Sequence, residues 1–137
     1  MEARFTVPGE PRGKGRPRFS NGHAYTDSDT RAYEEKLTVY YRRAYGSFRF
    51  PDNGFVQVAV TAFLLIPKSR TKATQAAMAR REILPSRKPD ADNVLKIVLD
   101  ALNGVAYKDD SRVYKVSCVK YYSTEPRLEI VIKEAGT

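Results

Sequence analysis

The 137-residue chain has the length of one domain, and its 42% apolar content, with nine Tyr and six Phe, favours an ordered globule over a disordered chain. No apolar run approaches the roughly 20 residues that a membrane helix requires, and the charged start MEARFTVPGE predicts no secretory signal. A net charge of +8 favours a polyanionic partner, either nucleic acid or an anionic membrane surface.

The first part of the chain predicts a strand, a hairpin and a helix. Residues 2–8 alternate apolar and polar side chains, as in a strand, and the Gly-, Pro- and Arg-rich residues that follow exclude a regular element. Asn21-Gly22 is a favoured turn pair and predicts a short hairpin. The Asp-Ser-Asp run after it can cap a helix that extends to about Ser47, with apolar residues at three- and four-residue spacing.

The second part predicts a buried strand, two helices and two closing strands. Every even position from Val56 to Ile66 is apolar, which indicates a central strand. The further elements are a short basic helix within 71–82, a helix over 91–103 that stops at Gly104, and strands over 112–122 and 127–134. No linker divides the chain, so we expect one domain over residues 1–137.

Carboxylates gather around the helix predicted at 91–103. The polar series consists of Asp90, Asp92, Lys96, Asp100, Asp109 and Asp110. Phosphodiester hydrolysis needs hard oxygen ligands for Mg²⁺, and a lysine can add fixed positive charge. A helix roughly 18 Å long separates the two carboxylate groups. The loop 104–110 must therefore fold back along the helix to bring an aspartate near Asp90 and Asp92.

Spacing alone leaves a structural interpretation open at equal weight. In that interpretation Asp90 or Asp92 caps the helix, Asp92 and Lys96 form an exposed ion pair, and the Asp109-Asp110 pair lies in a turn. Other sites are disfavoured. The single His and single Cys make a zinc site or a Ser-His-Asp triad improbable, and the run DADNVL lacks the glycine of a calcium loop.

The order of these residues resembles the core motif of the RusA-type endodeoxyribonucleases, the phage and prophage Holliday junction resolvases. That motif has an Asp-x-Asp-Asn opening, a Lys four residues after the second Asp, an Asp-Ala-Leu helix end and a late Asp-Asp-x-x-Val. All four parts occur in order in PDADNVLKIVLDALNGVAYKDDSRV. This strong match covers about 25 residues, and the rest of the chain is more loosely similar.

The resemblance implies a fold, a reaction and a set of residue roles. The fold is a small α+β domain in which a mixed sheet packs with two principal helices and a short basic helix. The implied protein is a homodimer that would nick four-way or branched DNA symmetrically during phage or prophage recombination and repair, in the cytoplasm of a bacterial or phage-infected cell. Mg²⁺, with Mn²⁺ as a substitute, is the only cofactor, and no membrane is involved.

By the same motif, Asp90, Asp92 and Asp110 bind the metal and Lys96 is the required catalytic lysine. Asp100 and Asp109 also match, and we expect them to support the metal ligands. Asn93 is expected to stabilise the start of the helix.

Two basic segments predict contacts to DNA phosphates. They contribute Arg12, Lys14, Arg16, Arg18, Lys68, Arg70, Lys72, Arg80, Arg81, Arg87 and Lys88. Binding through such groups should weaken steeply with salt. For any one of them, a solvated surface charge is an equally good interpretation. Phe19 and Tyr25 flank the predicted turn, and they either stack on DNA bases or form the core of the hairpin.

Three functions remain in competition. The first is a Mg²⁺-dependent endonuclease that resolves Holliday junctions. The second is a non-catalytic protein that binds branched DNA, with structural aspartates. The third is a nuclease that acts mainly on forks or flaps. The complete carboxylate–lysine set favours catalysis, but it does not separate the junction from other branched DNA.

Overall fold

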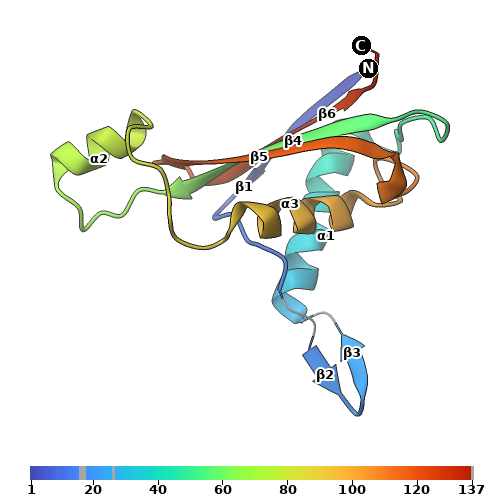
Figure 1. Ribbon diagram of the computed structural model, residues 1–137, viewed down its shortest axis with the longest axis horizontal. Helices are drawn as coiled ribbons and strands as arrows, with labels where there is room; N and C mark the ends of the chain where they lie inside the picture. Colours follow the sequence, from blue (N-terminus) through green and yellow to red (C-terminus); the bar gives the residue numbers. More distant parts are fainter. Residues whose placement is uncertain (16–17, 26, 137) are drawn as a thin grey trace.

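The computed structural model describes residues 1–15, 18–25 and 27–136, and its main feature is a four-stranded mixed sheet (Figure 1). The strands are β1 (Glu2–Pro8), β4 (Val56–Leu65), β5 (Val113–Ser123) and β6 (Arg127–Glu134), in the order β1-β6-β4-β5. β6 is antiparallel to both β1 and β4, whereas β4 and β5 are parallel. The helices are α1 (Ser28–Tyr45), α2 (Lys72–Ala79) and α3 (Ala91–Leu102). The predicted α+β class is confirmed.

The core lies between one face of this sheet and helices α1 and α3, which cover the same side (Figure 1). The even positions of β4, from Val56 to Leu64, are buried, as the sequence predicts. They lie in register with Leu128, Ile130 and Ile132 of β6, which are also fully buried. The sheet and the two helices therefore hold each other in place by burying apolar side chains.

Helix α1 begins and ends with polar and glycine caps. Asp27 is the N-cap, and its carboxylate accepts hydrogen bonds from the backbone N–H and from the hydroxyl of Thr30, both at 2.9 Å. Gly46 closes the helix with a positive φ of 60°, and its N–H donates to the Arg42 carbonyl at 2.7 Å. The helix therefore ends at Tyr45, two residues before the predicted end, because glycine adopts this conformation readily.

Helix α3 buries one face and is followed by a tight turn. Val94, Ile97 and Leu102 have no exposed surface. After the helix, the Gly104 N–H donates to the Tyr107 carbonyl at 2.9 Å, and the buried Tyr107 hydroxyl donates to the Leu99 carbonyl at 2.8 Å. The turn thus closes at the C-terminal end of α3, and it fixes where the following aspartates lie.

Two elements project from the body: α2 at one end of the sheet, and a separate hairpin beyond the start of α1 (Figure 1). The hairpin pairs β2 (Arg18–Ser20) with β3 (His23–Tyr25), and its turn residues Asn21 and Gly22 both have positive φ, which confirms the predicted turn. α2 is shorter than the predicted 71–82. No helix in the described ranges is long and apolar enough to cross a membrane.

Replacing Tyr107 by Phe should lower the free energy of unfolding by about 1–2 kcal/mol, because the Leu99 carbonyl loses its hydroxyl donor in a buried place. Urea denaturation measures the difference. Tyr114→Phe is the matched control, since Tyr114 is 54% exposed and should change stability by less than about 0.5 kcal/mol. Equal effects of the two variants would contradict a structural role for the Tyr107 hydroxyl.

Candidate active site

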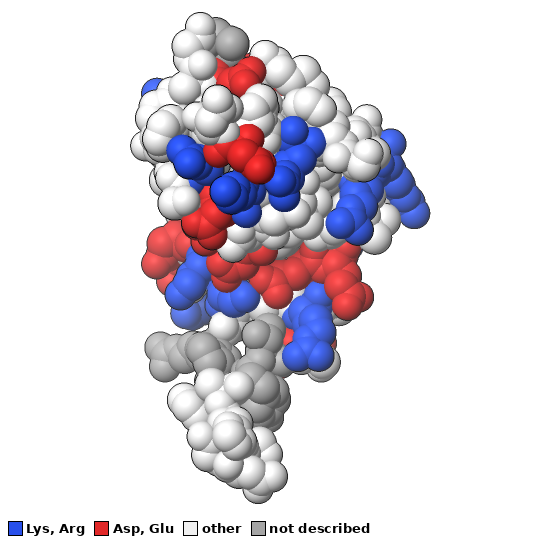
Figure 2. Space-filling model, turned by 90° about the vertical axis from the view of Figure 1, so that its right-hand side faces the viewer, with Lys and Arg blue, Asp and Glu red and all other residues white. Residues whose placement is uncertain are grey.

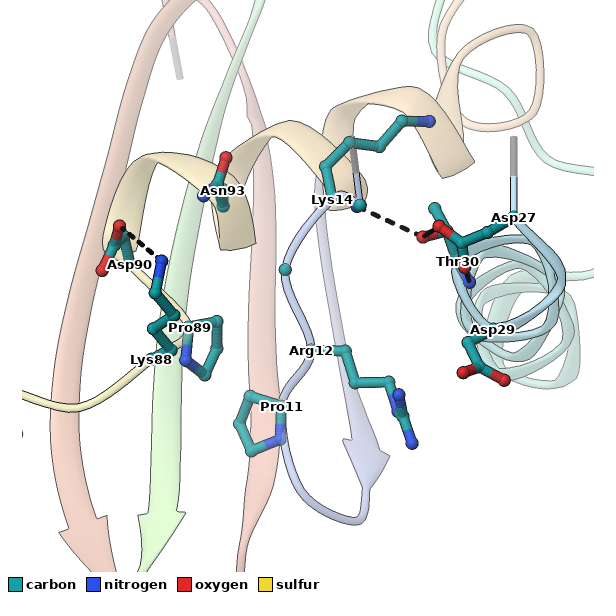
Figure 3. Close-up of a pocket in the computed structure, with 12 residues that line it drawn as sticks. Pro11, Arg12, Lys14, Asp27, Asp29, Thr30, Lys88, Pro89, Asp90 and Asn93 are labelled. Carbon is teal, nitrogen blue, oxygen red and sulfur yellow. Dashed lines mark hydrogen bonds and ion pairs between the residues drawn. The ribbon is translucent and has the colours of Figure 1, made fainter. Parts of the chain in front are cut away.

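The loop over residues 9–15 is built into the groove between α1 and α3 (Figure 3). The Lys14 N–H donates to the Asn93 carbonyl at 3.0 Å, which ties the loop to the first turn of α3. A Cβ on Gly13 would lie 2.9 Å from the Asn93 Cβ, and one on Gly15 would lie 2.3 Å from an Asp27 carboxylate oxygen. Larger residues would force these contacts apart, so the loop is a fixed part of the site.

A cleft of about 470 Å³ opens between this loop and the starts of α1 and α3 (Figure 3). Its lining residues are Pro11, Arg12, Gly13, Lys14, Gly15, Asp27, Asp29, Thr30, Lys88, Pro89, Asp90 and Asn93. Figure 3 shows the Arg12 side chain extending toward the start of α1, where Asp29 lies. The cleft is therefore lined by both carboxylates and basic side chains. Such a lining suits a phosphate-bearing ligand that is bound through a metal ion.

The carboxylates at the start of α3 are not used to cap the helix. Asp90 has the backbone position of an N-cap, but its side chain makes no capping hydrogen bond and is 55% exposed. Asp92 is exposed in the first turn, and in the described part of the chain it forms no ion pair with Lys96. The cap and ion-pair interpretations are therefore wrong for these residues. Both carboxylates and the Lys96 ammonium are open to a ligand.

The other end of α3 is held by a shared ion pair. The Lys14 ammonium lies 2.9 Å from the Glu34 carboxylate and 3.0 Å from the Asp100 carboxylate, with 18% of its side chain exposed. Burial acts to lower the pKa of Lys14, but hydrogen bonds to Glu34 and Asp100 outweigh it and raise the pKa above its ordinary value. Lys14, predicted to contact DNA, is thus placed between two carboxylates and links α1 to α3.

Asp109 and Asp110 follow the turn at this same end. Asp109 caps the short 3₁₀ helix η1 (Asp110–Arg112) by accepting from the Ser111 N–H at 3.1 Å, and the hydrogen bonds from Ser111 lower its pKa. Partial burial, followed by the negative charges of Asp100 and Asp109, raises the pKa of Asp110. Figure 2 faces this end of the molecule and shows Asp and Glu side chains in a band across its middle.

The predicted metal ligands therefore lie in two groups. Asp90 and Asp92 open α3, and the electrostatic neighbours of Asp110 are Asp100 and Asp109. Within residues 1–15, 18–25 and 27–136, no three His, Cys, Asp or Glu side chains gather closely enough to hold a metal ion. The three-aspartate set stays a prediction. Two open carboxylates nonetheless fit Mg²⁺, which proteins bind through one or two carboxylates together with substrate phosphates.

The predicted DNA contacts differ in how far they are engaged by the protein. Arg16 and the side chain of Arg18 lie outside the described residues. Besides Lys14, four of the others have protein neighbours: Arg80 pairs with Glu82, Arg81 stacks on Tyr121, Arg87 pairs with Glu10 at 2.7 Å, and Lys88 lies 4.0 Å from Asp90. Glu10 and Glu34, which the sequence did not single out, provide two of the key partners.

Phe19 settles one alternative for the hairpin. Its side chain is 75% exposed, so the prediction that it forms the core of the hairpin is wrong. The side chain of Tyr25 lies outside the described residues. An exposed aromatic ring on a projecting hairpin is suited to stacking on a base.

Two comparisons with known proteins identify the family of this chain. A sequence model of the family described as Endodeoxyribonuclease RusA matches residues 8–133. The chain is also 37% identical over 140 residues to a Bacillus subtilis (strain 168) protein described as uncharacterized protein YqaN, and the alignment covers 97% of this chain and 96% of that relative.

Lys14→Met should lower the free energy of unfolding by about 1–3 kcal/mol at pH 7, because Glu34 and Asp100 lose their shared cation. Since the folded pKa of Lys14 is raised, its contribution is complete below the usual lysine value of 10.5 and is lost as pH rises through the folded pKa. Chemical denaturation across pH 7–11 checks this. Lys115→Met, at an exposed position, is the control, and a deficit that does not shrink at high pH would contradict the ion-pair explanation.

Proposed function

The chain belongs to the RusA endodeoxyribonuclease family, and from that premise we propose that it is a Mg²⁺-dependent, structure-selective endonuclease that resolves four-way DNA junctions by symmetric nicking. One observation carries the proposal. The first turns of α3 carry Asp90, Asp92 and Lys96 with exposed charged groups, and Asp90 also lines the cleft, whose other lining residues include lysine and arginine side chains. The cellular role would be recombination and repair of phage or prophage DNA in the cytoplasm.

Each residue then has a defined role. Asp90 and Asp92 would hold the divalent cation, and Asp110, which follows the turn at the other end of α3, is the third ligand that the family motif predicts. When bound, that cation supplies charge neutralisation at the phosphate and a more acidic water. Lys96 places a fixed positive charge where negative charge develops on the phosphate oxygens. In the hydrolysis, a water oxygen forms a bond to phosphorus and one phosphodiester P–O bond breaks, which leaves a nick.

A homodimer provides the symmetry that this reaction needs. Two sites related by a two-fold axis can nick two equivalent strands of a junction. The edge of the sheet supports a second copy: among the described strands, β5 pairs with β4 alone, and its Tyr114, Val116 and Val119 are 54%, 44% and 41% exposed. Long edge strands with exposed apolar side chains are normally covered by another chain or element.

The two alternative functions, a non-catalytic DNA-binding protein and a nuclease for forks or flaps, differ in the side chains that they require. A non-catalytic DNA-binding protein needs no open carboxylates, since these repel phosphate, yet Asp90 and Asp92 are both exposed at the start of α3. The exposed ring of Phe19 favours a branched substrate, because stacking requires a base that is accessible at a branch point. Forks and flaps also offer such bases, and they are therefore tested beside the junction.

Asp92→Asn should bind a labelled four-way junction like the wild type. Its cutting rate should fall by a factor of roughly 100 or more, because a metal-binding carboxylate is lost. Nicking is measured on a junction, a fork, a flap and linear duplex, in Mg²⁺, in Mn²⁺ and in EDTA. Asp52→Asn is the control, since Asp52 pairs with Arg49 on the surface and should leave cutting unchanged. Metal-independent cutting, or full activity of Asp92→Asn, would overturn the proposed mechanism.

Phe19→Ala should weaken binding to a junction by the equivalent of about 1–3 kcal/mol, which is roughly 5- to 150-fold, because one stacked base loses its aromatic partner. Binding to linear duplex and thermal stability should not change, since Phe19 is 75% exposed. Phe19→Tyr keeps a ring and serves as the matched control. Wild-type junction affinity in Phe19→Ala would show that the ring has no role in recognising the branch.

A further inference from the structure

Three cations at the start of α2 are set apart from the rest of the basic segment 67–89. Arg80, Arg81 and Arg87 are engaged by Glu82, Tyr121 and Glu10, respectively. By contrast, Lys68, Arg70 and Lys72 are exposed, and within the described residues they have no ion-pair partner and no aromatic ring beneath them. We call these three side chains the basic turn. Their charges are available to a partner that lies outside the chain.

The backbone of the basic turn is ordered by side chains that are themselves uncharged. The Gln75 side-chain amide donates to the Arg70 carbonyl at 2.8 Å and to the Lys68 carbonyl at 3.4 Å. Thr71 is the N-cap of α2, and its hydroxyl oxygen accepts from the Thr74 N–H at 3.2 Å. Binding therefore needs to order only the side chains of the basic turn, which lowers its entropic cost.

The segment that carries the basic turn is also fastened to the body. Met78 is 97% buried, and the Lys120 ammonium donates to the Arg87 carbonyl at 2.8 Å. Arg81 has a φ of 67°, a conformation that favours glycine, yet its guanidinium lies 4.0 Å from the centre of the Tyr121 ring. The stacking explains why an arginine occupies this position, since it offsets the backbone cost and holds α2 against β5.

The place of the basic turn in the molecule indicates what it contacts. α2 lies at one end of the sheet and the hairpin with Phe19 projects elsewhere, with the start of α3 between them (Figure 1). The inference rests on the proposed function. If the branch point of the DNA lies at Asp90 and Phe19, the basic turn faces the DNA further along one arm. We propose that the basic turn grips the phosphates of a duplex arm away from the branch point, and that it reads no base sequence.

The chemistry of the basic turn fits this role. Lysine and arginine neutralise phosphates, and each phosphate contact adds about 0.9 to the slope of log affinity against log salt. Three contacts therefore predict that removing the basic turn lowers this slope by about 2–3. The loss depends on arm length, because an arm that is too short ends before it reaches α2. Sequence changes in the arm should have no effect.

The test uses the full-length protein in EDTA, so that binding is measured without cutting. The triple variant Lys68→Ala, Arg70→Ala, Lys72→Ala is compared with the wild type on junctions with arms of about 20 base pairs and on junctions whose arms are closed by loops after about eight. We expect the triple variant to bind the long-armed junction roughly tenfold or more weakly with a reduced salt slope, and the short-armed junction nearly as well as the wild type.

A control variant removes the same net charge away from α2 and from the β5 edge: Arg42→Ala, Arg43→Ala, Lys133→Ala. Equal losses in the two triple variants, or equal losses on both junctions, would overturn the arm grip. If the wild type binds the junction in EDTA and nicks it in a parallel assay in Mg²⁺, and the Lys68, Arg70, Lys72 variant binds as tightly as the wild type, the arm grip is overturned and the proposed function stands. Wild-type protein that neither binds nor nicks any branched DNA would overturn both. Thermal melting confirms folding, since all three side chains are exposed.

Discussion

The shared ion pair of Lys14 is the interaction on which the candidate site depends. Its ammonium joins Glu34 of α1 to Asp100 of α3, while its backbone N–H binds the first turn of α3 at Asn93. One residue therefore spans the helix that carries the carboxylates, from its start almost to its end. Gly13 and Gly15 allow this because neither position has room for a Cβ. The loop, the two helices and the cleft form one unit as a result.

The lysine and arginine side chains fall into two groups: those that stabilise the fold and those that are available to DNA. A net charge of +8 predicts a polyanionic partner, but several of the cations serve the fold. Lys14, Arg81 and Arg87 hold loops and helices in place, and their charges are largely satisfied within the chain. The charges available to DNA include those of Lys68, Arg70 and Lys72, which are exposed and have no ion-pair partner among the described residues. Because partner choice depends on side chains distant in sequence, composition alone could not divide the two groups.

Local patterns predicted most of the fold, since they depend on neighbours in the chain. The alternation in β4, the Asn21-Gly22 turn and a helix cap within the Asp-Ser-Asp run, at Asp27, were all confirmed. The path of the loop over residues 9–15 could not be predicted, because its Gly, Pro and Arg residues indicate only that no regular helix or strand forms there. The partner of Lys14 was equally hidden: Glu34 looked like part of a solvated helix face until the loop was placed against it.

The same limit applies to the carboxylates. Their order along the chain identified the family, whereas their distances depend on the turn after α3. Tyr107 closes that turn at the C-terminal end of the helix and leaves Asp110 under the influence of Asp100 and Asp109. Grouping like charges is unfavourable for the folded state, since each raises the free energy of its neighbours. Lys14 offsets this at Asp100 alone. Asp90 and Asp92 are exposed at the helix N-terminus, where the helix dipole favours carboxylates, so they cost the fold little. The repulsion that remains at Asp110 is the cost that the proposed cation would relieve.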